Sequence, residues 1–512
     1  MIVVYHNKNK VVEFANTDSF ITDKYRNLSI AESLMLLAKK DPENILVWCH
    51  LSLKEQLNIS EIEQLFHHKK ILLSYNPNTL FFDERIGYVE ESPFIKVNKS
   101  VTFPTWQMSS AVGCIPAKVL LALNKTIPLD RDFDYFLCSL AKLSMPKGLL
   151  CYSEPQLLKP KLESEYLPIK TSPYTLFRFV KQHYRMRWIF LLLFNLLIYE
   201  QKFPFLPFIF SFFYKNRSKL NISLDGVKVQ SSAKIVHKAT VDVIIPTIGR
   251  KNYLYDILKD LKAQTHLPKN VIIVEQNPDV ESKSELDYLT TEEWPFEIKH
   301  SFTHQAGACN ARNLALNQIE CEWVFLADDD IRIEEDCIQK SLHQINKFGV
   351  KAITLKCLQK GQKQKETPVF QWGTFGSGCS LIFADSLKDC VFKVGYEFGF
   401  GEDGDFGMQL RNQGCDVLFL PKPEILHLKA PIGGFRTKPV LQWHNDTIQP
   451  KPSPTVMLYK VLHNTIPQVN SYKTTLFFKY YRLQKIKNPL GYYNNFQKQW
   501  DRSVFWANEL NK

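Results

Sequence analysis

The centre of the chain alternates between short apolar runs and segments with helical spacing. Residues 241–246, 271–274 and 323–327 are apolar enough to form buried strands. Residues 253–264 carry apolar side chains three and four positions apart, and residues 310–318 also have helical character. Strands that alternate with helices in this way predict an α/β sandwich with a mainly parallel sheet.

Two almost purely apolar runs, 188–199 and 203–214, precede this region. Neither reaches the roughly 20 residues that a membrane-spanning helix needs, and Pro204 and Pro207 would interrupt a combined one. We expect residues 176–220 to lie at a membrane interface, because basic side chains that suit anionic lipid headgroups flank both runs. A buried helix pair that joins two domains is the alternative. The flanking basic residues are Arg178, Lys181, Arg185, Arg187, Lys215, Arg217 and Lys219.

Composition narrows the class of protein. The 512 residues are 45% hydrophobic and 13% aromatic, which is enough for two or three domain cores and excludes disorder as the default. The net charge of +12 favours anionic partners. The eleven cysteines include no C-x-x-C pair, which argues against a zinc site and a disulfide framework. The first residues lack the features of a signal peptide, so we expect a cytoplasmic protein that touches the inner face of the cell membrane.

Three consecutive carboxylates, Asp328, Asp329 and Asp330, follow the apolar run 323–327. They fall where a strand ends, which is the edge at which α/β sheets bind ligands. Adjacent like charges repel unless a cation compensates them. Hard oxygen ligands suit Mn²⁺ or Mg²⁺, and these ions also bind diphosphate oxygens. A lone acidic run is more often a solvated turn, so the neighbouring motifs decide the interpretation.

Chemically active residue types lie on both sides of the triplet. Upstream, Gly307 opens a helical segment that carries Arg312, and a helix start beside an arginine can receive phosphate charge. Downstream, Glu402 and Asp403 supply candidates for a general base, and His427 supplies a further metal ligand. The alternatives are a helix cap for Asp403, a strand-end position for His427 and a surface position for Arg312.

Residues 372–379 (WGTFGSGC) are rich in glycine. Glycines allow close approach of the backbone, so we expect Trp372 and Gly378 to line a ligand pocket. An ordinary hairpin is the alternative.

These motifs, taken in order, resemble a family 2 glycosyltransferase of the GT-A fold over residues 241–436. The segment GEDGDFG is also similar to the pattern of galactosyl- and N-acetylgalactosaminyltransferases. The matching segments are VDVIIPTIGR, GACNARN, FLADDD, GFGEDGDFGMQLRNQG and LPKPEILHLK.

The resemblance implies roles for individual positions. Asp328 to Asp330 would form the DXD motif, with Asp330 and Asp328 binding Mn²⁺ or Mg²⁺ and His427 completing the coordination. Asp403 matches the catalytic base, and Glu402 would orient the acceptor or hold the base. The nucleotide-sugar-binding positions would be Pro246, Thr247, Arg250, Gly307, Arg312, Asp328, Asp329, Trp372 and Gly378.

The second strand departs from the family pattern, which usually ends in an aspartate that contacts the nucleobase. This chain reads Val274-Glu275-Gln276-Asn277. We expect Glu275 to take the place of the aspartate, with Asn277 as a further contact. A UDP-sugar is the expected donor, and GDP- and dTDP-sugars are alternatives.

The implied reaction is inverting transfer of a sugar from a nucleotide-diphosphate donor to a hydroxyl of a glycan or lipid-linked glycan, in bacterial surface polysaccharide synthesis. Asp403 would take the acceptor proton, and a metal would stabilise the leaving diphosphate. One base opposite the leaving group predicts inversion. A bifunctional polysaccharide synthase and a basic nucleic-acid binder are the alternatives. No RNP, zinc-finger or helix-turn-helix pattern appears, so nucleic acid is not an expected partner.

The first 160 residues carry a fainter version of the same pattern. Residues 109–115 (SSAVGCI) resemble 376–382 (GSGCSLI), and Asp132 and Asp134 lie near the position of the Glu-Asp pair. Trp48-Cys49-His50 stands in place of the acidic triplet. We therefore expect a degenerate GT-A-like domain without catalysis, used for acceptor binding, homodimerisation or bracing.

The expected organisation has four parts. The C-terminal part mixes aromatic with basic residues and would be helical, facing a membrane or packed back on the catalytic domain. The parts are a degenerate GT-A-like domain at 1–160, a basic aromatic linker at 161–238, a catalytic GT-A domain at 239–440 and a C-terminal extension at 441–512.

Overall fold

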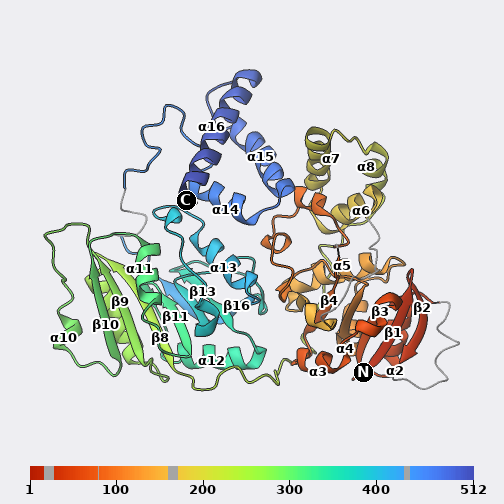
Figure 1. Ribbon diagram of the computed structural model, residues 1–512, viewed down its shortest axis with the longest axis horizontal. Helices are drawn as coiled ribbons and strands as arrows, with labels where there is room; N and C mark the ends of the chain where they lie inside the picture. The colour runs from red at the N-terminus through yellow and green to blue at the C-terminus, as the bar shows by residue number, and fades with distance from the viewer. Residues whose placement is uncertain (16–27, 79, 160–170, 432–438) are drawn as a thin grey trace. The chain divides into compact units, whose positions relative to one another are not determined.

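The computed structural model describes residues 1–15, 28–78, 80–159, 171–431 and 439–512 (Figure 1). The chain divides into two compact units. Unit one comprises Met1–Ser232, Pro368–Gln371 and Thr465–Thr474, and unit two comprises Ala233–Thr367, Trp372–Asn464 and Thr475–Lys512.

Unit two is built on a mixed sheet. The first four strands run parallel, β15 runs antiparallel to both of its neighbours, and β13 and β16 are parallel to each other. The strand order is β10 (Glu297–Thr303), β9 (Asn270–Gln276), β8 (Val241–Ile248), β11 (Trp323–Ala327), β15 (Cys379–Phe383), β13 (Ala352–Gln359), β16 (Val417–His427) and β12 (Ile331–Arg332).

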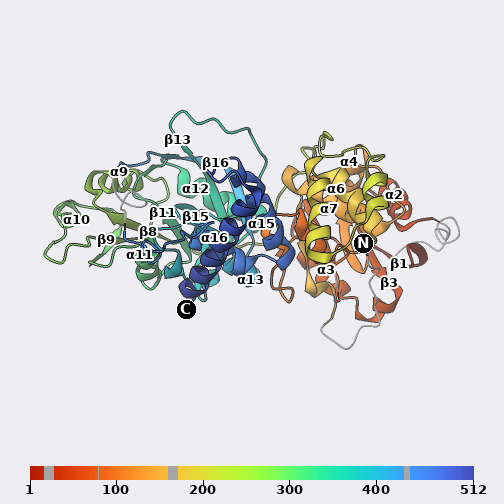
Figure 2. The same ribbon diagram turned by 90° about the horizontal axis from the view of Figure 1, so that it is seen from above.

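Helices cover both faces of this sheet. Figure 2 shows α9 (Lys251–Lys262) and α12 (Cys337–Phe348) on one side, and α11 (Ala308–Leu316) and α13 (Glu402–Asn412) on the other. The four apolar positions that predicted α9 are completely buried, and each such side chain contributes roughly 1.5–3 kcal/mol. The α/β sandwich expected from the alternating pattern is confirmed, and unit two has the GT-A fold. The buried α9 positions are Leu254, Ile257, Leu258 and Leu261. The short helix α10 spans Tyr288–Thr291.

Unit one contains a second mixed sheet of similar design. The helices that pack with it are α2 (Ile30–Lys40), α3 (Ile59–Leu65), α4 (Ala117–Asn124) and α5 (Phe133–Ser144). The strand order is β2 (Lys10–Ala15), β1 (Ile2–Asn7), β3 (Ile45–His50), β6 (Val112–Pro116), β4 (Ile71–Tyr75), β7 (Leu150–Ser153) and β5 (Phe103–Pro104).

Five strands of unit one repeat the arrangement of unit two. The order β1-β3-β6-β4-β7 matches β8-β11-β15-β13-β16, and each pair of neighbours has the same relative direction in both sheets. Beyond β1, however, the sheet continues only with the antiparallel strand β2 among the described residues. Unit one therefore has no described counterpart of the parallel strands β9 and β10.

The strand register places individual residues of the two units in equivalent positions. Trp48 pairs with Gly113, and Leu326 pairs with Ser380. Counting forward from these pairs, His50 takes the place of Asp328. The expectation that Trp48-Cys49-His50 replaces the triplet is thus two residues out of register, and the equivalent residues are 50–52.

Another pair of equivalent positions is Asp134 and Asp403, each the second residue of its helix. The Asp134 carboxylate accepts hydrogen bonds from the backbone N–H and hydroxyl of Ser110, at 2.6 and 2.7 Å. Burial raises the pKa of Asp134 to about 6, although the Ser110 bonds oppose this shift. In unit one this carboxylate therefore stabilises the fold by satisfying the N–H and hydroxyl of Ser110.

Aromatic side chains occupy the space around these residues in unit one. The ring of Phe133 stands edge-on to the Trp48 ring at 5.4 Å and to the His6 ring at 6.5 Å, and His6 is itself 5.4 Å from His50. Phe133 holds the position of Glu402, and His6 that of Pro246. In unit one this region is therefore filled by packed rings.

Residues 161–238, expected to form a linker, contribute three helices to unit one. Buried side chains of α6 (Pro173–His183), α7 (Arg187–Glu200) and α8 (Phe205–Ser211) join the hydrophobic core of that unit. The expectation of a linker is wrong for this segment, because one side of each helix has enough apolar area to pack on unit one. Among the described residues, no helix is long and apolar enough to cross a bilayer.

The C-terminal residues form α14 (Pro454–His463), α15 (Ile466–Tyr481) and α16 (Pro489–Leu510) (Figure 1). In unit two α14 packs on α13, and the buried His463 Nε2 lies 2.7 Å from Asp405 Oδ1. Asp405 also accepts a hydrogen bond from the Tyr396 hydroxyl at 3.3 Å. The C-terminal helices thereby fix the first turn of α13.

We expect Asp134→Ala to lower the stability of the protein. The substitution leaves the buried Ser110 N–H without a partner, which costs about 1–3 kcal/mol. Ser110→Ala removes only the hydroxyl bond and is expected to cost less. Urea unfolding of the full chain, followed by tryptophan fluorescence, measures both effects. Equal midpoints for the wild type and Asp134→Ala would contradict the structural role of this carboxylate.

Candidate active site

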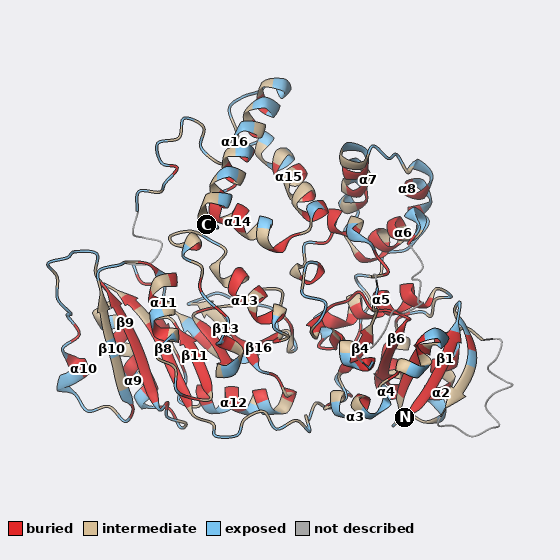
Figure 3. Ribbon diagram, viewed as in Figure 1, coloured by how far each residue is buried: buried red, intermediate tan, exposed pale blue. Residues whose placement is uncertain are grey.

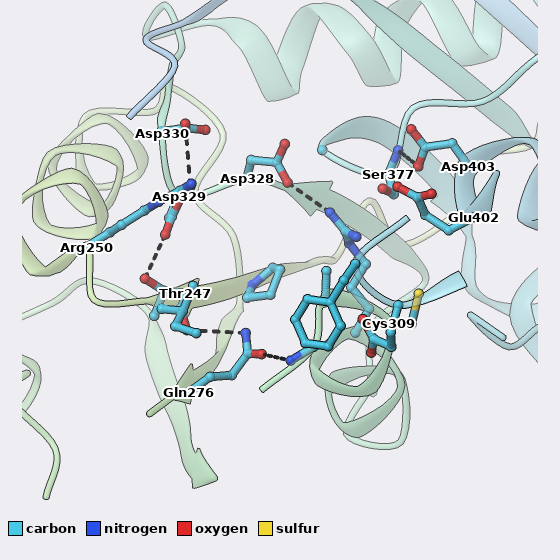
Figure 4. A pocket seen from close by; sticks show the side chains of 18 of the residues that line it. Thr247, Arg250, Gln276, Cys309, Asp328, Asp329, Asp330, Ser377, Glu402 and Asp403 are labelled. Carbon is cyan, nitrogen blue, oxygen red and sulfur yellow. Dashed lines mark hydrogen bonds and ion pairs between the residues drawn. The ribbon is translucent and has the colours of Figure 1, made fainter. Parts of the chain in front are cut away.

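A pocket of about 500 Å³ that several charged side chains line lies in unit two where β8 and β11 end (Figure 4). Its size is in the range of small-molecule sites. Most of the residues expected to bind the donor, the metal or the acceptor line it. They are Pro246, Thr247, Arg250, Gly307, Arg312, Asp328, Asp329, Asp330, Gly378, Glu402, Asp403 and His427.

Three expected residues do not line this pocket. Glu275 accepts from His300 Nε2 at 3.0 Å and from the Glu285 N–H at 3.2 Å, and the Asn277 side chain accepts from the Asp279 N–H. The Trp372 ring packs on Phe419 instead. These three positions are corrections to the expected site.

Strand alternation explains the error on β9. Successive side chains of a strand point to opposite faces, so Gln276 reaches the pocket when Glu275 and Asn277 do not. The Gln276 amide donates to the Thr247 carbonyl at 3.3 Å and accepts from the Gly307 N–H at 2.7 Å. Gln276 thus joins the end of β8 to the start of α11.

Asp329 is the most deeply held carboxylate of the triplet. It accepts from the Thr247 hydroxyl at 2.7 Å and pairs with Arg250 Nη1 at 2.6 Å. Burial raises its pKa to about 6, although Arg250 and Thr247 act in the opposite direction. Asp329 therefore fixes Thr247 and Arg250 rather than facing the open pocket.

Asp328 points toward Arg312, away from the Asp329–Arg250 pair. Its Oδ1 lies 3.0 Å from Nη2 of the buried Arg312. A Cβ atom at Gly378 would come within 2.1 Å of Asp328 Oδ2, so only glycine fits there. Arg312 Nε is buried without a hydrogen-bond partner among the described residues. Arg312 therefore holds Asp328 in place and keeps one N–H group that no described residue accepts.

Asp330 and His427 bring a carboxylate and an imidazole together at the pocket edge. His427 Nε2 lies 3.2 Å from Asp330 Oδ1, and Asp330 Oδ2 accepts from the Ala430 N–H at 2.8 Å. Arg250 Nη1 is 3.5 Å from the same carboxylate. Among the described residues, no cluster of three or more His, Cys, Asp or Glu side chains forms a closed metal site. Two convergent ligands fit an ion that takes its remaining ligands from a substrate.

The start of α11 differs from the expectation that it receives phosphate. The Glu397 carboxylate accepts from the Asn310 N–H at 2.7 Å, and it lies where a Cβ at Gly307 would be. A negative charge therefore already satisfies the free N–H groups and the dipole of this helix. Gly307 lines the pocket but leaves Glu397 room to cap α11.

Glu402 and Asp403 form the opposite end of the pocket (Figure 4). Asp403 Oδ1 accepts from the Ser377 N–H at 3.1 Å, which matches the Asp134–Ser110 contact of unit one. Burial and the Asp403 charge raise the pKa of Glu402 to about 7. Burial also raises the pKa of Asp403, although the Arg312 charge opposes this shift. A buried carboxyl pair whose pKa values are raised is suited to proton transfer.

Sequence reasoning missed several polar residues of the pocket, among them Gln276, Ser377 and Glu397. Gln276 was recoverable from strand parity, since its side chain points to the opposite face of β9 from Glu275. Ser377 was recoverable from its repeat in the first half at Ser110. Glu397 carried no comparable signal, because its contact with α11 joins segments 87 residues apart.

The comparisons with known proteins match part of the chain. Residues 242–392 match the model of glycosyl transferase family 2. No curated protein matches the chain.

Among solved structures, the chain is similar to S. aureus TarS 1–349, with 20% identity and a TM-score of 0.32 over 37% of this chain. The match covers 60% of the TarS 1–349 chain. The complex of S. aureus TarS 1–349 with UDP-GlcNAc matches with 16% identity and a TM-score of 0.37, over 53% of this chain and 88% of that chain. The residues that match the model of glycosyl transferase family 2, 242–392, form the larger part of the pocket in unit two.

Proposed function

We propose that this protein is an inverting glycosyltransferase that moves a sugar from a UDP-sugar to a hydroxyl of a glycan or lipid-linked glycan in bacterial surface polysaccharide synthesis. The observation that carries the proposal is the arrangement of one pocket, with Asp330 and His427 at one end and the Glu402–Asp403 pair at the other. Such a site has separate places for a leaving diphosphate and an attacking hydroxyl.

The donor end combines negative ligands with nearby cationic side chains. Arg250 pairs with Asp329 and lies 3.5 Å from Asp330, and Arg312 pairs with Asp328. Thr247 and Gln276 lie on the β8–β9 side, where the nucleotide is proposed to bind. A structure of S. aureus TarS 1–349 in complex with UDP is consistent with a uridine donor.

Mn²⁺ or Mg²⁺ is the proposed cofactor, held by Asp330 and His427. Carboxylate and imidazole ligands suit Mn²⁺, and ions of this class commonly take few protein ligands when they bind a diphosphate. When bound, the ion would stabilise negative charge on the leaving group. Asp328 is the weaker candidate for a ligand, because Arg312 already pairs with it.

The acceptor end supplies the base. Asp403 is proposed to accept the proton of the acceptor hydroxyl as that oxygen attacks the anomeric carbon. Glu402, beside it on α13, orients the acceptor. The Ser377 N–H and the network of Asp405 with His463 hold the first turn of α13 in place. One base on the side opposite the leaving group yields inversion.

A first test compares the equivalent carboxylates of the two units. Asp403→Asn is expected to lower turnover by about 10²–10⁴-fold, the range of general-base catalysis. Asp134→Asn is the matched control and should retain turnover, because Asp134 lies in unit one. Release of UDP from UDP-sugars measures both. Full turnover in Asp403→Asn would exclude it as the base.

The same assay predicts a pH dependence. The base must be ionised, and the raised pKa values of Glu402 and Asp403 hold the carboxyl pair partly protonated below about pH 7. We therefore expect kcat/KM to fall as the pH drops below about 7. Glu402→Gln should move this acidic limb to lower pH.

A further test concerns the metal. Asp330→Asn and His427→Ala are expected to weaken Mn²⁺ binding at least tenfold, because each removes one of two ligands. Electron paramagnetic resonance of free Mn²⁺, in the presence of UDP, measures binding without turnover. Asp385→Asn, an exposed carboxylate, is the control. Unchanged Mn²⁺ affinity in both site variants would contradict the proposed ligands.

A further inference from the structure

The helices α7 and α8 of unit one expose an apolar surface that the proposed reaction does not use. Figure 3 shows pale blue residues along α8 and on part of α7. The side chain of Phe213 is 79% exposed, that of Leu206 is 60% exposed and that of Phe203 is 59% exposed. We call this set the aromatic surface; it consists of Phe190, Phe194, Leu197, Ile198, Phe203, Phe205, Leu206, Ile209, Phe210, Phe212, Phe213 and Tyr214.

The apolar character of α7 extends around the whole helix. Ile189, Leu192 and Leu196 are buried against unit one, but Phe190 and Phe194 on other sides are exposed. A helix that only packs on a domain has one apolar side and one polar side. The second apolar side of α7 therefore needs a second apolar environment.

Ring contacts hold the aromatic surface together as one patch. The Phe190 ring lies 5.4 Å from Phe208 and 6.2 Å from Phe212, so the start of α7 meets the end of α8. Tyr174 of α6 lies 5.9 Å from Phe210. A contiguous apolar patch of this kind marks an interaction site on a soluble domain.

The charges next to the patch are almost all positive. Residues 173–219 contain eight Lys or Arg residues and a single acidic one, Glu200. Arg185, Arg187, Lys215 and Lys219 are exposed, and none of them forms an ion pair with a described residue.

Hydrogen bonds bring Arg185, Arg187 and Lys215 together, where α7 begins and where the chain leaves α8. The Asn216 amide donates to the carbonyls of Lys181 and Tyr184, at 3.0 and 2.9 Å, which ties the residues after α8 to the end of α6. Lys215 and Arg185 are the immediate chain neighbours of these bonded residues, and Arg187 begins α7. A basic cluster thus borders the aromatic surface.

We propose that the aromatic surface inserts into the interface of a lipid bilayer with anionic headgroups. Phenylalanine and leucine side chains enter the boundary of the acyl chains, and the basic cluster lies among the headgroups. The fourteen residues of α7 extend about 21 Å, which is shorter than the roughly 30 Å hydrocarbon core, so the helix pair lies in one leaflet.

Charge argues against a second copy of this chain as the partner. A symmetric dimer through the aromatic surface would bring two basic clusters together, and juxtaposed like charges disfavour association. Anionic headgroups instead complement the cluster. The membrane contact is independent of the proposed transferase activity, so each can be tested without the other.

Vesicle binding of the full chain tests this proposal. We expect the wild type to sediment with vesicles of phosphatidylcholine and phosphatidylglycerol, and to bind pure phosphatidylcholine vesicles at least tenfold less tightly. The triple variant Leu206→Ser, Phe210→Ser, Phe213→Ser should lose binding to both. The triple variant Arg185→Gln, Arg187→Gln, Lys215→Gln should lose only the preference for anionic vesicles.

The control carries Val280→Ser and Val440→Ser, which remove exposed apolar side chains of unit two and should leave binding unchanged. Circular dichroism and UDP release report whether each variant keeps its fold. Equal vesicle binding by the wild type and the Leu206, Phe210 and Phe213 variant would overturn the proposal. A wild-type dimer that this variant converts to monomer, without any vesicle binding, would also overturn it and assign the surface to self-association.

Discussion

The repulsion between three consecutive carboxylates is the constraint on which the pocket of unit two depends. Asp328, Asp329 and Asp330 follow one another at the end of β11, and basic side chains lie against each of them. Arg312 pairs with the first and Arg250 with the second; Arg250 also lies 3.5 Å from the third, which His427 approaches as well. Because these side chains come from α11, the end of β8 and the end of β16, the contacts of the triplet join three elements at one edge of the sheet.

The two units show what the same topology becomes when this constraint is removed. In unit one His50 stands at the position of Asp328, and the residues after it are Leu51 and Ser52. No triplet has to be neutralised there, and Trp48, Phe133 and His6 pack into the region. The contact between a helix carboxylate and a serine N–H persists in both units, as Asp134–Ser110 and Asp403–Ser377. The same hydrogen bond therefore stabilises the fold of unit one, and in unit two we propose that it positions the catalytic base.

Much of unit two was predictable because its signals are local. Strand β11 and helix α9 follow directly from apolar periodicity, and the resemblance to family 2 glycosyltransferases rests on contiguous motifs. The predictions of individual site residues failed where the role of a residue depends on the direction of its side chain or on a partner far away in the sequence. Glu275 and Asn277 were chosen by position in a motif, but strand parity turns Gln276 to the pocket. The start of α11 looked open to phosphate, but Glu397 caps it from 87 residues away. The packing of α6, α7 and α8 on unit one does not follow from the sequence, because burial of their inner sides depends on the rest of that unit.

The central claim is that the chain binds one nucleotide, in unit two. The equivalent region of unit one is filled by core side chains. Isothermal titration of the full chain with UDP in the presence of Mn²⁺ tests it most directly. One UDP bound per chain is the expected stoichiometry, and Thr247→Ala together with Arg250→Ala should abolish that binding. Two UDP molecules bound per chain, or binding that survives the double substitution in unit two, would contradict it.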